Sequence, residues 1–289
     1  MRLDGRRSSS NVEDRRGMRG RGGRIAGFSG LGGLIVAALL VWVSGGNPLS
    51  VLTGGGRSAL DSRQTEEYRP SEREEAYADF SKKILAGTED VWTEEFHKLG
   101  LTYEPPRMVL YTGSVQSACG SATSAVGPFY CSGDKTLYID LSFFDQMERQ
   151  MGAGGDFAYA YVIAHEVGHH VQNLLGTLGQ AHDAMARMNQ TDANNMSVRI
   201  ELQADYYAGV WAYHDNRMFG SLEDGDIEEG INAAQKIGDD YLQKQAQGYA
   251  VPDAFTHGTS AQRMRWLKKG ASTGDITGGD TFSVPYSSL

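Results

Sequence analysis

Residues 156–176 read DFAYAYVIAHEVGHHVQNLLG, and the interpretation of the whole chain starts from this stretch. Asp156 is a residue type that caps helix starts and Gly176 one that ends helices, so the stretch predicts a single helix. Most of the other residues are apolar, which indicates a helix buried on most sides. Buried imidazoles and carboxylates need partners, because an unpaired buried charge costs several kcal/mol. The partner that their spacing favours is a metal ion.

The polar residues of this helix have the His-Glu-x-x-His spacing of zinc hydrolases. His165 and His169 stand one turn apart on one face, where two imidazole nitrogens can occupy two corners of a zinc tetrahedron. Glu166 is turned away from that pair and is predicted to act as the general base on the metal-bound water. A Zn²⁺ cofactor is therefore expected, although a five-residue match by itself also arises by chance.

A pair of carboxylates further along the chain offers the missing ligand. In ELQAD (201–205), Glu201 and Asp205 lie one helical turn apart. Glu201 would be the third zinc ligand and leave a fourth position for water, while Asp205 would accept the second ring N–H of a ligating histidine. The alternative is an ordinary solvated acidic face. The apolar neighbours of both residues indicate a largely buried helix and favour the zinc site.

A third candidate region is FTHGTSAQR (255–263), at the start of a predicted late helix. Helix N-termini bind anions well, and amide hydrolysis needs a donor that stabilises the developing oxyanion. His257 is the residue predicted to do this. The alternative is that Thr259 or Ser260 merely caps the helix and that His257 has no catalytic role.

The charge distribution separates the beginning of the chain from the rest. Residues 1–24 contain eight arginines and carry a net charge of +5, which leaves −14 for the remainder. Residues 25–44 contain no charged side chain, and twenty residues are long enough to span a bilayer core of roughly 30 Å. The positive-inside rule then predicts a cytoplasmic tail, one transmembrane helix, and a periplasmic or extracellular remainder. A cleaved signal peptide is the alternative.

So acidic a remainder argues against nucleic-acid binding, which relies on clustered lysine and arginine.

Cys119 and Cys131 are the only cysteines and are expected to form a disulfide, since both fall in the part predicted to be exported. Two independent buried thiols are the alternative. Strands are predicted at 106–113, 126–131 and 136–140, ahead of helices at 142–151, 156–175, 195–214, 226–247 and 259–269. Strands followed by helices indicate an α+β fold.

Taken together, these motifs resemble the putative neutral zinc metallopeptidase family of bacterial single-pass membrane proteins. The resemblance extends from residue 1 to about 270 and is carried by GRRSSSNVEDRRG (5–17), CGSATSAVGPFYC (119–131), YVIAHEVGHH (161–170), ELQAD (201–205) and FTHGTSAQR (255–263). The Glu-x-x-x-Asp segment and the late histidine are also similar to those of gluzincins. The resemblance implies a compact gluzincin-like fold with a small antiparallel sheet. It also implies the site roles His165, His169 and Glu201 as ligands, Glu166 as base, Asp205 behind a ligand and His257 at the oxyanion.

The expected organisation is a tail at 1–24, a transmembrane helix at 25–44, a linker at 45–70, a zinc metallopeptidase domain at 71–270 and a polar tail at 271–289. The expected activity is that of a membrane-anchored zinc metalloendopeptidase acting on extracytoplasmic proteins or peptides. VGPFYC (126–131) is either an edge strand to which an extended substrate adds or an ordinary core hairpin. The alternative function is a catalytically silent, zinc-stabilised binding or scaffold protein tethered to the membrane.

Overall fold

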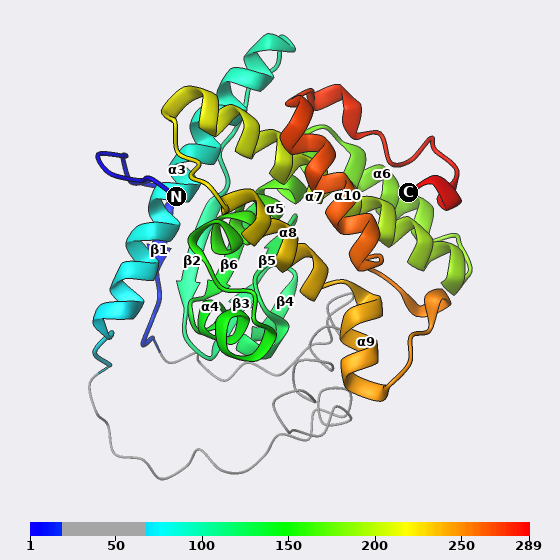
Figure 1. The fold of residues 1–289 in the computed structure, drawn as a ribbon, viewed down its shortest axis with the longest axis horizontal. Helices are drawn as coiled ribbons and strands as arrows, with labels where there is room; N and C mark the ends of the chain where they lie inside the picture. The colour runs from blue at the N-terminus through cyan, green and yellow to red at the C-terminus, as the bar shows by residue number, and fades with distance from the viewer. Residues whose placement is uncertain (19–67) are drawn as a thin grey trace.

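The computed structural model describes residues 1–18 and 68–289 of the chain. The strands in this part of the chain are β1 (Val12–Asp14), β2 (Arg107–Tyr111), β3 (Ser114–Ser117), β4 (Gly120–Thr123), β5 (Phe129–Cys131) and β6 (Thr136–Asp140). The helices are α3 (Glu72–Lys98), α4 (Ser142–Gln146), α5 (Asp156–Leu174), α6 (Thr177–Met185), α7 (Gln190–Phe219), α8 (Asp226–Lys236), α9 (Asp239–Gln247) and α10 (Ser260–Thr273). Strands that precede a set of packed helices confirm the α+β class (Figure 1).

The main sheet has the strand order β1-β2-β6-β5 and is mixed. β1 runs parallel to β2, and β2 runs parallel to β6, with Val109 opposite Tyr138. Only β5 is antiparallel in this sheet, and it pairs with β6 through the turn at 132–135. The predicted antiparallel sheet is therefore wrong for β1, β2 and β6. β6 runs parallel to β2 because the chain between them is long. It contains the separate β3–β4 hairpin and β5, and it returns β6 to the direction of β2.

Several helix boundaries differ from the sequence predictions. α3 is one continuous helix and begins with a capping box between Ser71 and Glu74. The predicted helix at 226–247 is instead two helices that meet at Gly238, where a Cβ atom would lie 2.4 Å from the backbone nitrogen of Ser260. α5 begins at Asp156, as the predicted range has it, but Gly155 and not Asp156 is its N-cap.

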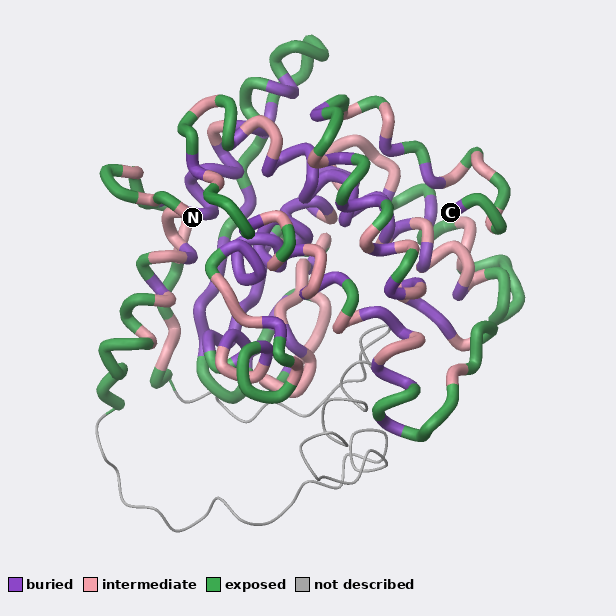
Figure 2. Tube along the Cα trace, in the orientation of Figure 1, coloured by how far each residue is buried: buried purple, intermediate pink, exposed green. Residues whose placement is uncertain are grey.

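The core lies where α7 packs against both α5 and α10, and α5 also contacts α3 and β5. Figure 2 shows that the buried positions concentrate in this centre of the molecule. Glycines let the helices approach closely. A Cβ atom on Gly168 of α5 would lie 2.9 Å from the carbonyl oxygen of Ala204 in α7. One on Gly270 of α10 would lie 2.1 Å from the carbonyl oxygen of Tyr206 in α7. The three helices that carry the candidate site residues are thus held at fixed, short separations.

The predicted disulfide between Cys119 and Cys131 is confirmed, with a Cα–Cα distance of 5.8 Å. It ties the end of β5 to the turn between β3 and β4. Closing a loop of this length stabilises a fold by about 3 kcal/mol in the chain-entropy model. The segment that forms the edge of the main sheet is therefore anchored covalently.

Both ends of the chain lie against the domain where the structure describes them. Within residues 271–289, expected to be a polar tail, the Thr281 hydroxyl donates to the carbonyl of Arg199 at 2.7 Å, and Leu289 is buried. Residues 1–18 run beside α3 and add β1 to the sheet (Figure 1). The expected membrane segment, 25–44, falls outside the described residues. Among the residues that are described, no helix has the length and apolar character needed to cross a bilayer.

The close crossing of α7 and α10 predicts that Gly270→Ala is destabilising. The new methyl group would meet backbone atoms that cannot rotate away, so we expect a loss of at least about 2 kcal/mol in the free energy of unfolding. Urea unfolding followed by circular dichroism measures this. Gly179→Ala is the matched control, because its Cβ meets nothing within 4 Å in α6. If the two variants were equally stable, the close crossing would be wrong.

Candidate metal centre

His165, His169 and Glu201 form a compact cluster between α5 and α7. One donor atom from each lies within 4.8 Å of the others. The Nε2 atom of His165 is 3.1 Å from one carboxylate oxygen of Glu201, and that of His169 is 3.5 Å from the other. The structure thus brings together the three residues predicted as zinc ligands.

Both histidines are oriented by a partner on their other ring nitrogen. Nδ1 of His165 lies 2.8 Å from Asp205, and Nδ1 of His169 lies 2.9 Å from the side-chain oxygen of Gln172. Gln172 is in turn fixed, because its amide donates to the carbonyl of Ile200 at 2.7 Å. With Nδ1 occupied on both rings, both Nε2 atoms face Glu201. Two imidazoles with such partners and one carboxylate are a donor set that fits Zn²⁺.

Gln172 was not predicted from the sequence. It lies one turn after His169 on the same helix, and that spacing was the available signal. Asp205 was predicted as a partner of a ligating histidine, and the structure places it beside His165.

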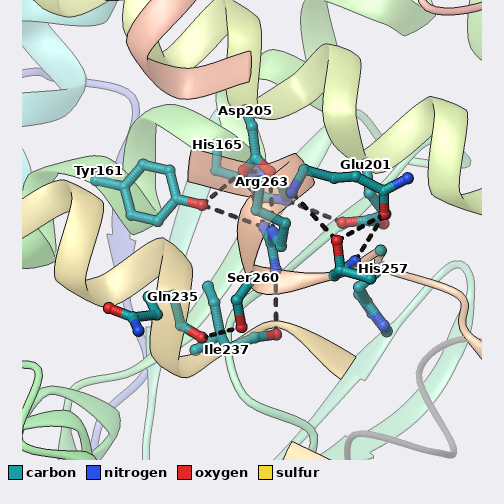
Figure 3. Close-up of polar contacts among 12 residues, drawn as sticks. Tyr161, His165, Glu201, Asp205, Gln235, Ile237, His257, Ser260 and Arg263 are labelled. Atoms are coloured by element: carbon teal, nitrogen blue, oxygen red, sulfur yellow. Dashed lines mark hydrogen bonds and ion pairs between the residues drawn. The ribbon is translucent and has the colours of Figure 1, made fainter. Parts of the chain in front are cut away.

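Asp205 is the centre of a buried polar cluster (Figure 3). Arg263 of α10 donates to both of its oxygens, at 2.8 and 2.9 Å, and the Tyr161 hydroxyl of α5 donates at 2.6 Å. Asp205 is 0% exposed and Arg263 3%. Burial alone would raise the pKa of Asp205, but Arg263 and His165 lower it to about 2. Asp205 is therefore ionised and accepts a hydrogen bond from Nδ1 of His165. Neither Arg263 nor Tyr161 was predicted as a site residue from the sequence.

Glu166 lies beside the cluster and is not one of its three donors. It is almost fully buried, at 9% exposure. Burial raises the pKa of the Glu166 carboxyl group above its usual value, while His169, His165 and a hydrogen bond from the Tyr130 backbone act in the opposite direction. A carboxyl group whose pKa is raised is better suited to accept and return a proton.

His257 is held by Asp239, the first residue of α9. One oxygen of Asp239 accepts the backbone N–H groups of Thr256 and His257, both at 2.7 Å, and of Gly258 at 3.1 Å. Nδ1 of His257 is 3.3 Å from the other oxygen. Burial lowers the pKa of His257, but Asp239 and Glu201 raise it above its usual value. Thr259 caps α10, as the alternative interpretation expected, and the oxyanion role of His257 stays a prediction.

Strand β5 is attached to the helix that carries the histidines. The Tyr130 hydroxyl is 2.9 Å from Nδ1 of His170, whose other ring nitrogen is 2.7 Å from the carbonyl oxygen of Glu104. Burial lowers the pKa of His170 to about 4, so this histidine is neutral and has a structural role. The end strand of the main sheet is therefore fixed next to Glu166.

Comparisons with known proteins agree with this arrangement. A family model described as "Putative neutral zinc metallopeptidase" matches residues 1–282. The chain is 49% identical over 290 residues to "Uncharacterized protein YpfJ" of Escherichia coli strain K12, covering 98% of this chain and 99% of that protein. It is 46% identical over 192 residues to "Uncharacterized protein Rv2575" of Mycobacterium tuberculosis strain H37Rv, covering 63% of this chain and 64% of that protein. No solved structure matches the chain.

The Asp205 cluster predicts that Asp205→Asn is strongly destabilising. The change leaves the Arg263 guanidinium buried without a counter-charge, which costs about 3–5 kcal/mol in the free energy of unfolding. The double variant Asp205→Asn/Arg263→Met should recover much of this loss, because no unpaired charge remains. Calorimetry or urea unfolding measures both.

Asp183→Asn, on an exposed position of α6, is the control and should change stability by less than about 0.5 kcal/mol. The difference between wild type and Asp205→Asn should also shrink as the pH falls from about 4 towards 2. The reason is that the native pKa of Asp205 is lowered to about 2 from its ordinary 3.8, so protonation removes the stabilisation in that range. A difference that is absent at pH 7 would contradict the cluster.

Proposed function

The chain belongs to the putative neutral zinc metallopeptidase family, and from this premise we propose that it is a zinc-dependent endopeptidase. The observation that carries the proposal is the convergence of His165, His169 and Glu201 on one point with Glu166 beside them. Ligands of this kind on two helices also support a gluzincin-like domain.

The division of roles follows from what each side chain contacts. Zinc, when bound, polarises the scissile carbonyl and lowers the pKa of water. Glu166 accepts the proton of the attacking water and then delivers it to the leaving amine, for which its raised pKa is suited. His257, whose pKa is raised by Asp239 and Glu201, donates a hydrogen bond to the oxygen that becomes negative in the transition state.

The substrate would bind in an extended conformation along β5. This strand is last in the order of the main sheet, and the Tyr130 backbone contacts the Glu166 carboxylate. An extended peptide that adds beside β5 passes the catalytic carboxylate and continues in both directions. This favours internal cleavage of a protein or peptide chain. The Cys119–Cys131 disulfide supports a site of action outside the cytoplasm, where such bonds persist.

A catalytically silent scaffold is less well supported. Glu166 makes no contribution to the three-donor cluster, so zinc-dependent stability alone gives no reason for a buried carboxylate at this position. A carboxylate with a raised pKa next to the cluster is what hydrolysis requires.

Two glutamate variants separate metal binding from catalysis. Glu166→Gln should keep one zinc per chain and near-native stability, because Glu166 is not a ligand, yet lose ~10²–10⁴-fold in the rate of peptide hydrolysis. Glu201→Gln should lose zinc and, since metal binding is coupled to folding, melt at a lower temperature. Metal analysis, calorimetry and a casein or peptide-library assay give the three readouts. Loss of zinc from Glu166→Gln with retention in Glu201→Gln would overturn the ligand assignment.

His257→Gln tests the oxyanion role. We expect kcat to fall by roughly 10²–10³ with zinc content and KM little changed, since a transition-state donor is lost and no ligand is removed. His182→Gln, at an exposed position of α6, is the matched control and should retain full activity. An unchanged kcat in His257→Gln would contradict the oxyanion role and show that His257 has only a structural role in the loop.

A further inference from the structure

Residues 1–18 bind to the domain along a continuous surface made by β2, α3 and α7. On β2, the backbone N–H of Met108 donates to the carbonyl of Asn11 at 2.9 Å, and that of Arg15 donates to the carbonyl of Leu110 at 2.8 Å. On α3, the side chain of Asn11 donates to Glu89 at 2.8 Å. This segment therefore closes one edge of the main sheet.

The centre of this contact is the ion pair between Arg6 and Asp215 of α7. Nη2 of Arg6 lies 2.7 Å from the carboxylate, with the two side chains only 10% and 2% exposed. The guanidinium also lies 3.7 Å from the centre of the Phe219 ring. α3 makes room for the pair at Gly87, where a Cβ atom would come within 2.6 Å of Arg6 and 2.7 Å of Asp215. Glycine at position 87 thus leaves the space that this ion pair occupies.

Other arginines of the segment are also paired with the domain. Arg7 contacts Asp90 at 2.6 Å, and Arg16 contacts Glu75 at 2.9 Å. The +5 charge of residues 1–24 was the reason to predict a cytoplasmic tail. The structure gives three of these arginines a different role, because each is bound to a carboxylate of α3 or α7.

The end of the first described range, residues 1–18, lies close to the start of the second, residues 68–289. A Cβ atom on Gly17 would lie 2.3 Å from the ring of Tyr68, so the two residues are in contact. Nη1 of Arg16 also donates to the carbonyl of Glu74 at 3.3 Å. The end of the first described range and the start of the second therefore lie side by side on the domain.

We propose that residues 1–18 are a permanent part of the domain and share one compartment with residues 68–289. A sheet strand and a buried ion pair form only between groups in one aqueous phase, so a bilayer cannot separate them. The chain between residues 18 and 68 then begins and ends on the same side. This replaces the expected arrangement, in which residues 1–24 are cytoplasmic and the domain lies outside.

Two variants of the full-length protein, each with one added cysteine besides the Cys119–Cys131 disulfide, test this arrangement. Ser8→Cys and Ser287→Cys lie at exposed positions at opposite ends of the chain. A membrane-impermeant maleimide is applied to spheroplasts that produce each variant, before and after lysis, with the wild-type protein as the blank. We expect both cysteines to be labelled in intact spheroplasts.

If both are labelled only after lysis, one compartment is still supported, and it is the extracytoplasmic site of action that fails. Labelling of one before lysis and of the other only after lysis would overturn the proposal.

The contact itself is tested on the purified full-length protein. Arg6→Ala should lower the melting temperature by roughly ten degrees, because Asp215 is left buried without its counter-charge. Arg2→Ala removes an arginine that is 66% exposed and should change the melting temperature by no more than about two degrees. Equal shifts for the two variants would show that the segment is not docked.

Discussion

The buried carboxylate of Asp205 is the interaction on which the rest of the domain depends. It belongs to α7 and is bound by Arg263 of α10 and by His165 and Tyr161 of α5. A buried charge is tolerated only with such partners, so the three helices have one arrangement in which it is satisfied. The same carboxylate turns Nε2 of His165 towards Glu201. The contacts of Asp205 therefore determine both the packing of the three helices and the geometry of the metal centre. Metal binding should for this reason stabilise the fold.

The local chemistry was predictable from the sequence, because helical spacing fixes which side chains share a face. His165 with His169, and Glu201 with Asp205, are one turn apart, and this spacing was enough to place them. The partners from other elements were not predictable in this way. Arg263 reaches Asp205 only because Gly270 lets α10 approach α7, and the pairing of Asp239 with His257 depends on the bend between α8 and α9.

The fold was predictable in class and not in topology. The strands predicted at 106–113, 126–131 and 136–140 correspond to β2, β5 and β6, whereas β1, β3 and β4 were not predicted. The relative direction of the strands depends on long connections that carry no periodic signal. The docking of residues 1–18 was missed for a related reason. A cluster of arginines followed by an apolar stretch is the usual pattern of a membrane anchor, and only the three-dimensional structure shows carboxylates such as Asp215 and Asp90 opposite those arginines. The charge pattern alone did not show that these arginines contact carboxylates of the domain.

The most direct test of the central claim is a crystal structure of the zinc-loaded protein with anomalous data at the zinc edge. We predict one zinc ion per chain, with the Nε2 atoms of His165 and His169 at ~2.0–2.1 Å and a carboxylate oxygen of Glu201 at about 2.0–2.2 Å. Asp205 should keep its contact with Nδ1 of His165, and Glu166 should not be a ligand. A zinc ion bound elsewhere, or one ligated by Glu166 in place of Glu201, would contradict the account.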